Sequence, residues 1–147
     1  MRRTRIKTQS TVLVFCLFAF CLACGSVPTL ESAECTQGRD TVKRFYSFHF
    51  GNDMQPSAEN LAQRKSYLTP ELFATLSAGT DTKIDYFTAT DSYPKAFRIG
   101  SCTAQGTEKV SFQIVLFWKD DTRSEQKEVK AELVRSSDVW LISKVTN

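Results

Sequence analysis

The segment 109–118, KVSFQIVLFW, constrains the fold of this chain more than any other stretch. Because successive side chains of a β-strand point to opposite faces, apolar residues at every second position predict a strand with one buried face. Val115 and Phe117 are also apolar on the reverse side, so we expect either a helix over that side or an exposed docking patch. The residues of the main apolar face are Val110, Phe112, Ile114, Leu116 and Trp118.

Three further strands are expected around this one. Residues 95–104 carry Phe97, Ile99 and Cys102, and residues 128–135 alternate apolar with charged side chains. Residues 139–145 carry Trp140 and Ile142. Polar turns at 119–122 and 136–138 separate consecutive strands. Consecutive strands joined by short turns predict an antiparallel sheet.

A first helix is expected over residues 39–52, where apolar residues recur at helical spacing. Gly51-Asn52 predicts a left-handed stop at its end. The spacing predicts one buried helical face, which holds Val42, Phe45, Tyr46 and His49.

Two more helices are expected before the sheet. Ser57 is placed to cap one over residues 57–67. Thr69-Pro70-Glu71 has the composition of a helix start, and Gly79 marks the end of that helix. We therefore expect an α+β protein in which three N-terminal helices pack on a curved four-stranded antiparallel sheet.

The first 23 residues have the composition of an export signal. Four basic residues and no acidic residue lie within the first seven positions, and the run 12–23, VLVFCLFAFCLA, carries no charge. Such a run is shorter than the roughly 20 apolar residues that a membrane-spanning helix needs, and it matches the apolar core of a signal peptide. We expect residues 1–23 to be removed on export.

The sequence at the end of this run resembles a bacterial lipobox. Ala23 and Cys24 match the motif, whereas Cys21 stands where an aliphatic residue is usual. The resemblance implies that Cys24 carries a lipid and begins a tether over residues 24–34. The residues directly after Cys24 are Gly25 and Ser26, and neither is an aspartate. The resemblance therefore also implies an anchor in the outer membrane, facing the periplasm. Cleavage after Gly25 is the alternative, and it would give a soluble periplasmic or secreted protein.

Without the leader the chain is nearly neutral. Residues 24–147 hold 15 Lys and Arg residues against 16 Asp and Glu residues. Proteins that bind nucleic acid depend on a clustered cationic surface, so nucleic acid is not an expected partner. Residues 24–147 hold a single histidine and no CxxC or HxxxH spacing, so neither a metal nor another cofactor is expected.

Cysteine usage predicts one disulfide. Cys16 and Cys21 leave with the signal and Cys24 is the lipidation candidate, so that Cys35 and Cys102 remain. Two cysteines in an oxidising compartment predict a bond between them. Two separate thiols are the alternative.

Four short motifs resemble those of the NTF2-like (cystatin-type cone) superfamily. They are VKRFY at 42–46, YLTPEL at 67–72, DYF at 85–87 and W-x-I-x-x-V at 140–145. With three helices followed by a four-stranded meander, the chain is similar to a family of bacterial secreted or lipid-anchored domains of unknown function. The resemblance implies one domain over residues 35–147, in which a long helix and the sheet enclose a pocket.

Seven residues are candidates for lining such a pocket. Asp85 beside Tyr86 is the pair that an acid-base site would use. Alternatively, Asp85 closes a turn while the aromatic residues pack in the core, and His49 is a hydrogen-bonded core histidine. No GxSxG elbow or glycine-rich phosphate loop is present, so no residue is assigned a catalytic role. The seven are Tyr46, His49, Asp85, Tyr86, Arg98, Trp118 and Trp140.

These features favour a non-catalytic lipoprotein of the cell envelope, whose domain binds another envelope protein or a small ligand. A small isomerase-like or dehydratase-like enzyme is one alternative, and an inhibitor or immunity protein against a periplasmic hydrolase is another. A polar pocket enclosing a buried carboxylate would favour the enzyme, whereas a filled interior would favour the binding protein.

Overall fold

A computed structural model describes residues 31–79, 82–119 and 124–147 as an α+β protein. The helices come first, as α2 (Ala33–Phe50), α3 (Ala58–Arg64), the 3-10 turn η2 (Lys65–Tyr67) and α4 (Pro70–Ala78). The strands β1 (Ala96–Ala104), β2 (Lys109–Lys119), β3 (Ser124–Ser136) and β4 (Val139–Thr146) follow. They form one open antiparallel sheet in the order β1-β2-β3-β4. The expected signal peptide and Cys24 lie outside the described residues.

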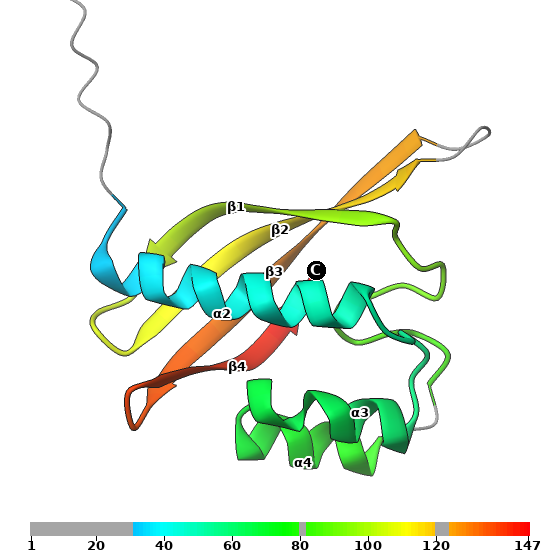
Figure 1. The fold of residues 1–147 in the computed structure, drawn as a ribbon, viewed down its shortest axis with the longest axis horizontal. Helices are drawn as coiled ribbons and strands as arrows, with labels where there is room; N and C mark the ends of the chain where they lie inside the picture. The colour runs from blue at the N-terminus through cyan, green and yellow to red at the C-terminus, as the bar shows by residue number, and fades with distance from the viewer. Residues whose placement is uncertain (1–30, 80–81, 120–123) are drawn as a thin grey trace, which may run out of the picture. The chain divides into compact units, whose positions relative to one another are not determined.

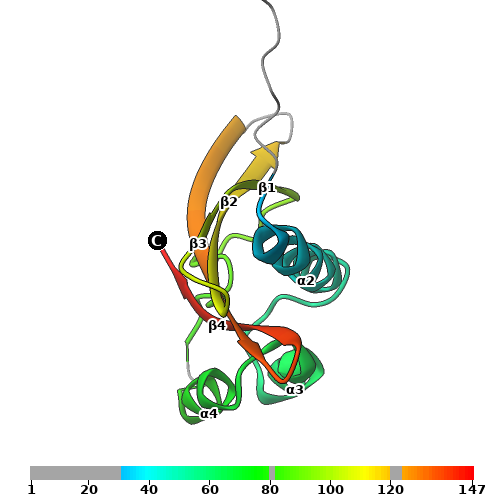
Figure 2. The same cartoon turned by 90° about the vertical axis from the view of Figure 1, so that its left-hand side faces the viewer.

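The helices occupy different positions around the sheet. Helix α2 packs on β1, β2 and β4, whereas α4 lies against β4, and α3 packs chiefly against α4 and η2. Figure 1 shows α2 crossing one face of the sheet, and Figure 2 shows α3 and α4 beyond the β4 edge. The expected packing on the sheet is therefore correct for α2 and wrong for α3. Helix α3 offers one partly buried apolar side chain to the core, Leu61, and its fully buried residue is Arg64.

Helix α2 begins six residues before the expected start and inside the expected tether. Ser32 caps it by accepting a hydrogen bond from the Cys35 amide. Gly38 lies in the middle of the helix, where a Cβ would come within 2.8 Å of the Val110 Cγ2 atom. Glycine at this position therefore allows α2 to approach β2 closely, and it does not break the helix.

The end of α2 falls where expected but has a different geometry. Gly51 is right-handed, with φ of −83°, so the expected left-handed stop is wrong. The Gly51 amide donates to the Ser47 carbonyl, and the Asn52 side chain donates to the Phe48 carbonyl at 2.7 Å. These bonds satisfy terminal carbonyl groups without a positive φ.

The expected bounds of the first strand are nearly correct, whereas the expected start of the third strand is wrong. Strand β1 bears a bulge between Ile99 and Cys102, which explains why an odd and an even position both face inward. Strand β3 begins at Ser124, four residues before the expected start, and pairs with β2 as far as Lys119. This first part of β3 is polar on both faces, so its strand conformation comes from pairing with β2 and not from burial of an apolar face.

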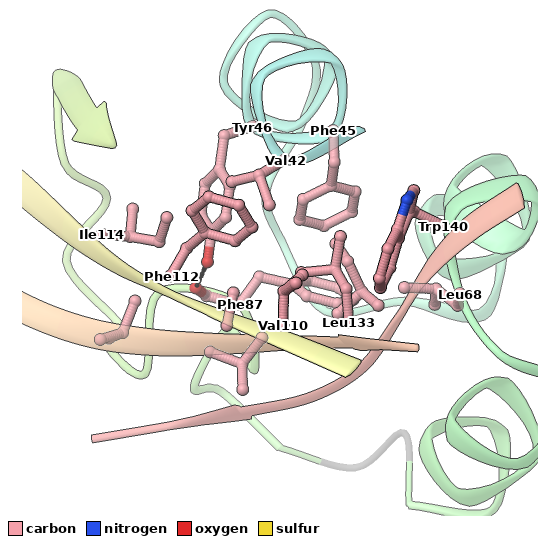
Figure 3. Close-up of a cluster of buried hydrophobic side chains, with 14 of the residues drawn as sticks. Val42, Phe45, Tyr46, Leu68, Phe87, Val110, Phe112, Ile114, Leu133 and Trp140 are labelled. Atoms are coloured by element: carbon pink, nitrogen blue, oxygen red, sulfur yellow. Dashed lines mark hydrogen bonds between the residues drawn. The ribbon is translucent and has the colours of Figure 1, made fainter. Parts of the chain in front are cut away.

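The core lies between α2 and the inner face of the sheet (Figure 3). The even positions of β2 from Val110 to Leu116 are fully buried, and Trp118 is 6% exposed. Helix α2 contributes Val42, Phe45 and Tyr46, all completely buried. The buried helical and strand faces predicted from the sequence are therefore confirmed. None of the helices in the described part of the chain is long and apolar enough to cross a membrane.

The reverse face of the sheet differs from the expectation. Val115 is buried there, at 3% exposure, and not exposed. It lies on the central strand β2 between its partners Arg98 and Glu128, whose long side chains flank it. Phe117 is half-buried, with Ala96 and Gln126 beside it.

Candidate functional site

The C-terminal half of α2 directs two candidate residues to the same region. Tyr46 and His49 lie three positions apart on the buried face of the helix, so their side chains are neighbours. The Tyr46 hydroxyl donates to the Phe87 carbonyl at 3.0 Å. The imidazole of His49 stacks on Phe45 and meets the edge of Phe87, with centroids 5.6 and 5.3 Å apart. Both side chains are held rigidly by the core.

Asp85 lies in the loop between α4 and β1 and closes a turn. Its carboxylate accepts hydrogen bonds from the amides of Phe87 and Thr88, at 3.4 and 3.0 Å, and from the Thr88 hydroxyl at 2.5 Å. The same carboxylate lies 2.9 Å from His49 Nε2. Asp85 therefore closes a turn and is also the partner of His49.

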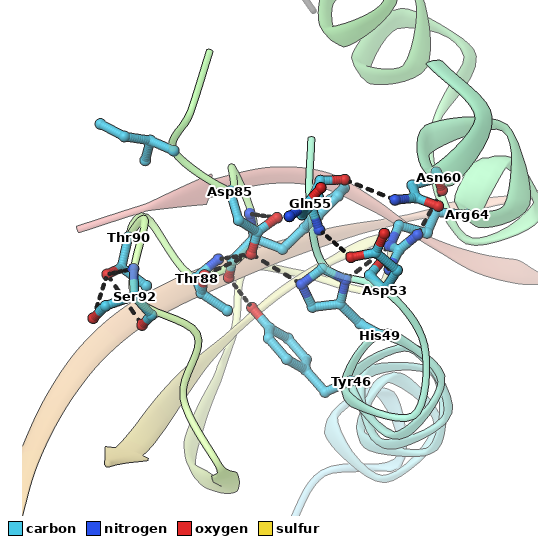
Figure 4. A network of polar contacts seen from close by, with 12 residues as sticks. Tyr46, His49, Asp53, Gln55, Asn60, Arg64, Asp85, Thr88, Thr90 and Ser92 are labelled. Atoms are coloured by element: carbon cyan, nitrogen blue, oxygen red, sulfur yellow. Dashed lines mark hydrogen bonds and ion pairs between the residues drawn. The ribbon is translucent and has the colours of Figure 1, made fainter. Parts of the chain in front are cut away.

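Arg64 completes this network, although no sequence motif predicts a role for it (Figure 4). Its Nε atom donates to His49 Nδ1 at 2.7 Å. The two terminal nitrogens donate to the carbonyls of Asn60 and Asp53, at 2.5 and 2.8 Å. The residue is 2% exposed. Three segments far apart in sequence thus meet at one imidazole.

The bond from Arg64 fixes the tautomer of His49. A guanidinium group can only donate hydrogen bonds, so Nδ1 must carry a lone pair. The proton of the neutral imidazole then lies on Nε2, and this N–H group donates to Asp85. The cation, the neutral ring and the anion form a chain without net charge, which is how a protein interior can hold such groups.

Burial governs the electrostatics of this region. Desolvation lowers the pKa of Arg64, and the negative charges of Asp85 and Asp53 oppose this effect. Desolvation raises the pKa of Tyr46 far above its ordinary value, and the charge of Asp85 adds to the increase. Tyr46 is consequently a neutral hydrogen-bond donor at every physiological pH, and not a proton-transfer group.

A small pocket lies beside the network. His49, Asp85 and Tyr86 line it, together with residues of the 54–57 connection, α3, α4 and the 82–87 loop. Its volume is about 60 Å³. One water needs about 10–15 Å³, whereas pockets for small-molecule ligands hold about 300–1,000 Å³. The space therefore suits a few waters or a single side chain.

The remaining candidates lie elsewhere. The Trp118 indole donates to the Ser92 carbonyl at 2.5 Å, and the Trp140 indole donates to the Gln37 side chain at 3.3 Å. Arg98 is exposed on β1. The Tyr86 hydroxyl accepts from the Val145 amide at 3.1 Å, so this residue fastens the 82–95 loop to β4.

At the other end of α2, Cys35 forms the expected disulfide with Cys102 of β1. The Cα atoms of Cys35 and Cys102 lie 5.9 Å apart. Glu31 lies near both sulfur atoms. Because these sulfurs are bonded to each other, they are not free thiolates and are poor metal ligands. Glu31 instead forms an ion pair with Arg39, whose Nη2 atom also donates to the Gly100 carbonyl at 3.1 Å.

Sequence comparisons give no family for this chain, since no protein-family model and no curated protein matches it. Among solved structures, it is similar to a protein of unknown function from Bacteroides thetaiotaomicron, with 14% identity and a TM-score of 0.55. That likeness covers 96% of this chain and 100% of the other. At this identity it concerns the fold alone.

A second similar structure is described as Ntf2-like, the potential transfer protein TraM from the Gram-positive conjugative plasmid pIP501. The identity is 14% and the TM-score is 0.49, over 76% of this chain and 94% of that one.

Proposed function

We propose that this chain is a non-catalytic binding protein of the cell envelope, with an NTF2-like domain that docks another envelope protein. Three helices precede a four-stranded meander, and the long helix α2 lies across the sheet, in keeping with that type of domain. Cys24 carries the lipid anchor in this proposal, and residues 25–31 connect it to the folded domain.

The filled interior carries this proposal. The space between α2 and the sheet, where a substrate would bind, is occupied by side chains that are completely buried, such as Tyr46, Phe112 and Leu116. Every buried side-chain nitrogen and oxygen atom of the described residues has a hydrogen-bond partner within the protein. A site that awaited a polar ligand would leave some of these groups unpaired. Binding is therefore assigned to the surface.

The surface that we propose for docking is the Phe117 corner, defined as Ala96 and Phe117, which lie side by side on the reverse face of the sheet. Elsewhere on this face polar side chains bond to one another, as in the Lys109–Glu132 ion pair at 3.0 Å and the Gln113–Glu128 hydrogen bond at 2.6 Å. Phe117 is a half-buried aromatic side chain at the edge of this polar surface. Aromatic anchors of this kind dominate the energetics of protein interfaces.

Cross-linking in intact cells, followed by capture of the tagged chain from solubilised envelopes and mass spectrometry, tests this proposal. A specific envelope protein should be captured by the native chain and lost with Phe117→Glu, because a charge replaces the aromatic anchor. Gln126→Glu places the same charge on the neighbouring strand without removing the ring, so most of the capture should remain. Capture that is equally strong with folded Phe117→Glu would contradict the docking surface.

The anchor is tested separately. The native chain should incorporate labelled fatty acid and sediment with membranes, and Cys24→Ala should lose both properties. A native chain that is soluble and begins at Ser26 would show that ordinary cleavage occurs.

An acid-base enzyme of the isomerase or dehydratase type is the second candidate, because the His49–Asp85 pair borders a pocket. Against it, both imidazole nitrogens are already bonded, so His49 has no lone pair free for a substrate proton. We expect Asp85→Asn and His49→Gln to preserve the cellular role of the chain. Loss of that role in Asp85→Asn protein that is still folded by circular dichroism would favour the enzyme.

A further inference from the structure

His49 connects α2 with α3 and with the 82–95 loop, and the loop and α3 differ in their other contacts with the protein. It belongs to α2, it accepts a hydrogen bond from Arg64 of α3, and it donates one to Asp85 of the 82–95 loop (Figure 4). The loop has other attachments, including the Tyr46 bond to the Phe87 carbonyl and the Tyr86 bond to β4. Helix α3 packs chiefly against α4 and η2, with Leu61 partly buried against the core and Arg64 fully buried. The Arg64–His49 bond is therefore its principal polar connection to α2.

This bond exists only while His49 is neutral. If Nδ1 gains a proton, an N–H group of His49 faces the N–H group of Arg64 at 2.7 Å, and neither can accept. The bond is then lost, and two positive charges adjoin in a buried site. Asp85 balances one of them, and the exposed carboxylate of Asp53 compensates the other only in part.

The protein side chains that contact the ring offer no other acceptor for the new N–H group. On α2, Phe45 and Tyr46 present aromatic rings, and the Tyr46 hydroxyl is committed to the loop. From the loop, Phe87 presents its ring, and the Asp85 carboxylate lies at Nε2, on the opposite side of the imidazole. Near Arg64, the Asp53 carboxylate caps the Gln55 amide and is exposed. Separation of Arg64 from His49 is thus the direct way to relieve the conflict.

We propose that the chain Arg64–His49–Asp85 is a proton-operated latch, which holds α3 against α2 when His49 is neutral and releases α3 when His49 takes up a proton. Because the docked form excludes the proton from Nδ1, acid must favour the released form. Release moves the wall of the small pocket that Asn60, Leu61 and Arg64 provide, and so uncovers the apolar ring of Phe87. The proposal is independent of the docking role assigned to the Phe117 corner.

Nuclear magnetic resonance of the full domain tests the latch. Long-range proton–nitrogen spectra at about pH 8 should show a neutral His49 with its proton on Nε2. Between about pH 8 and pH 5, amide exchange in α3, corrected for its intrinsic pH dependence, should accelerate about tenfold or more relative to α2 and β2. A proton on Nδ1 at about pH 8, or unchanged relative protection of α3 once His49 is protonated, would overturn the proposal.

A matched variant separates the proton from the general effect of acid. In His49→Gln the side-chain amide keeps an acceptor and a donor but does not titrate in this range, so relative protection of α3 should become independent of pH. A folded variant that retains the native pH response would exclude His49 as the sensor. If the variant does not fold, the measurements on the native chain still test the latch, because they report the tautomer of His49 and the amide exchange rates of α3 directly.

Discussion

The two ends of α2 are fastened by different chemistry. At the first end, Cys35 is joined covalently to Cys102 of β1, and Gly38 lets the helix backbone lie directly on Val110. At the second end, Tyr46 and His49 donate hydrogen bonds to a loop, and His49 accepts one from Arg64 of α3. Neither the disulfide nor the Gly38 contact contains a group that titrates, whereas the second attachment contains a histidine, an aspartate and an arginine.

This difference separates the conditions that each end can withstand. Covalent attachment is indifferent to proton concentration and depends on the redox potential of the surroundings. A buried polar network is indifferent to reductant and depends on the protonation of its members. The same helix therefore has one end sensitive to reductant and one end sensitive to acid.

The largest effect is expected at the covalent end. Removing the disulfide with Cys102→Ser should lower the free energy of unfolding by about 4 kcal/mol, because the bond closes a loop with a sequence separation of 67 residues. Urea titration with and without reductant measures this loss. Reductant should weaken the native chain by the same amount and leave the variant unchanged, and the loss should be equal at about pH 8 and pH 5. If the urea midpoint of the native chain did not change with reductant, the disulfide would not stabilise this end of α2.

A smaller effect is expected at the polar end when its anion is removed. Asp85→Ala should cost about 3 kcal/mol, because it removes the buried counter-charge of the Arg64–His49 pair and leaves the Thr88 amide without its acceptor. Chemical unfolding at about pH 8 measures the loss. Asp85→Asn is the control, and it should lose less because its amide oxygen can still accept from Thr88. Equal stability of the native chain and Asp85→Ala would mean that the network does not hold this end.

The smallest effect is expected from a single hydroxyl group. Tyr46→Phe keeps the buried ring and removes the hydrogen bond to the Phe87 carbonyl, so about 1 kcal/mol should be lost. Because the Tyr46 hydroxyl does not titrate in the physiological range, this loss should be the same at about pH 8 and pH 5. A loss that grew sharply in acid would mean that the Tyr46 bond belongs to the latch.

The sequence predicted those parts of the fold that depend on local periodicity. The alternation in β2 and the Thr69-Pro70-Glu71 start of α4 are both present, and Thr69 accepts a hydrogen bond from the Leu72 amide as an N-cap. The turn at Ser137 and Asp138 is also present, with positive φ at both residues. In each case the signal lies within a few consecutive residues.

The start of α2 was missed because Gly38 has a role that only the tertiary structure reveals. Glycine lowers the helix propensity of its segment, and nothing in the sequence indicates that β2 lies against this position. The start of β3 was missed for a related reason. Its residues 124–127 are polar, and their strand geometry comes from pairing with β2.

The candidate site was predicted in part. His49, Asp85 and Tyr86 do line one pocket, but Trp118 and Trp140 bond to other parts of the protein and Arg98 is exposed. Arg64 was not recognised, since it lies on a short polar helix, 15 positions from His49. An arginine in such a helix is ordinarily solvated, and the single histidine of the chain was the one available hint that a polar partner would be needed.

The order of the strands also bears on how the chain reaches its native state. Each strand of the sheet pairs with the one that precedes or follows it in the sequence. Such pairings have low contact order, so the meander can assemble by successive hairpins at small entropic cost. Helix α2 precedes the strands in the chain, and its disulfide partner Cys102 has a sequence separation of 67 residues from Cys35. We therefore expect the sheet to form the folding nucleus, and α2 to dock on it afterwards.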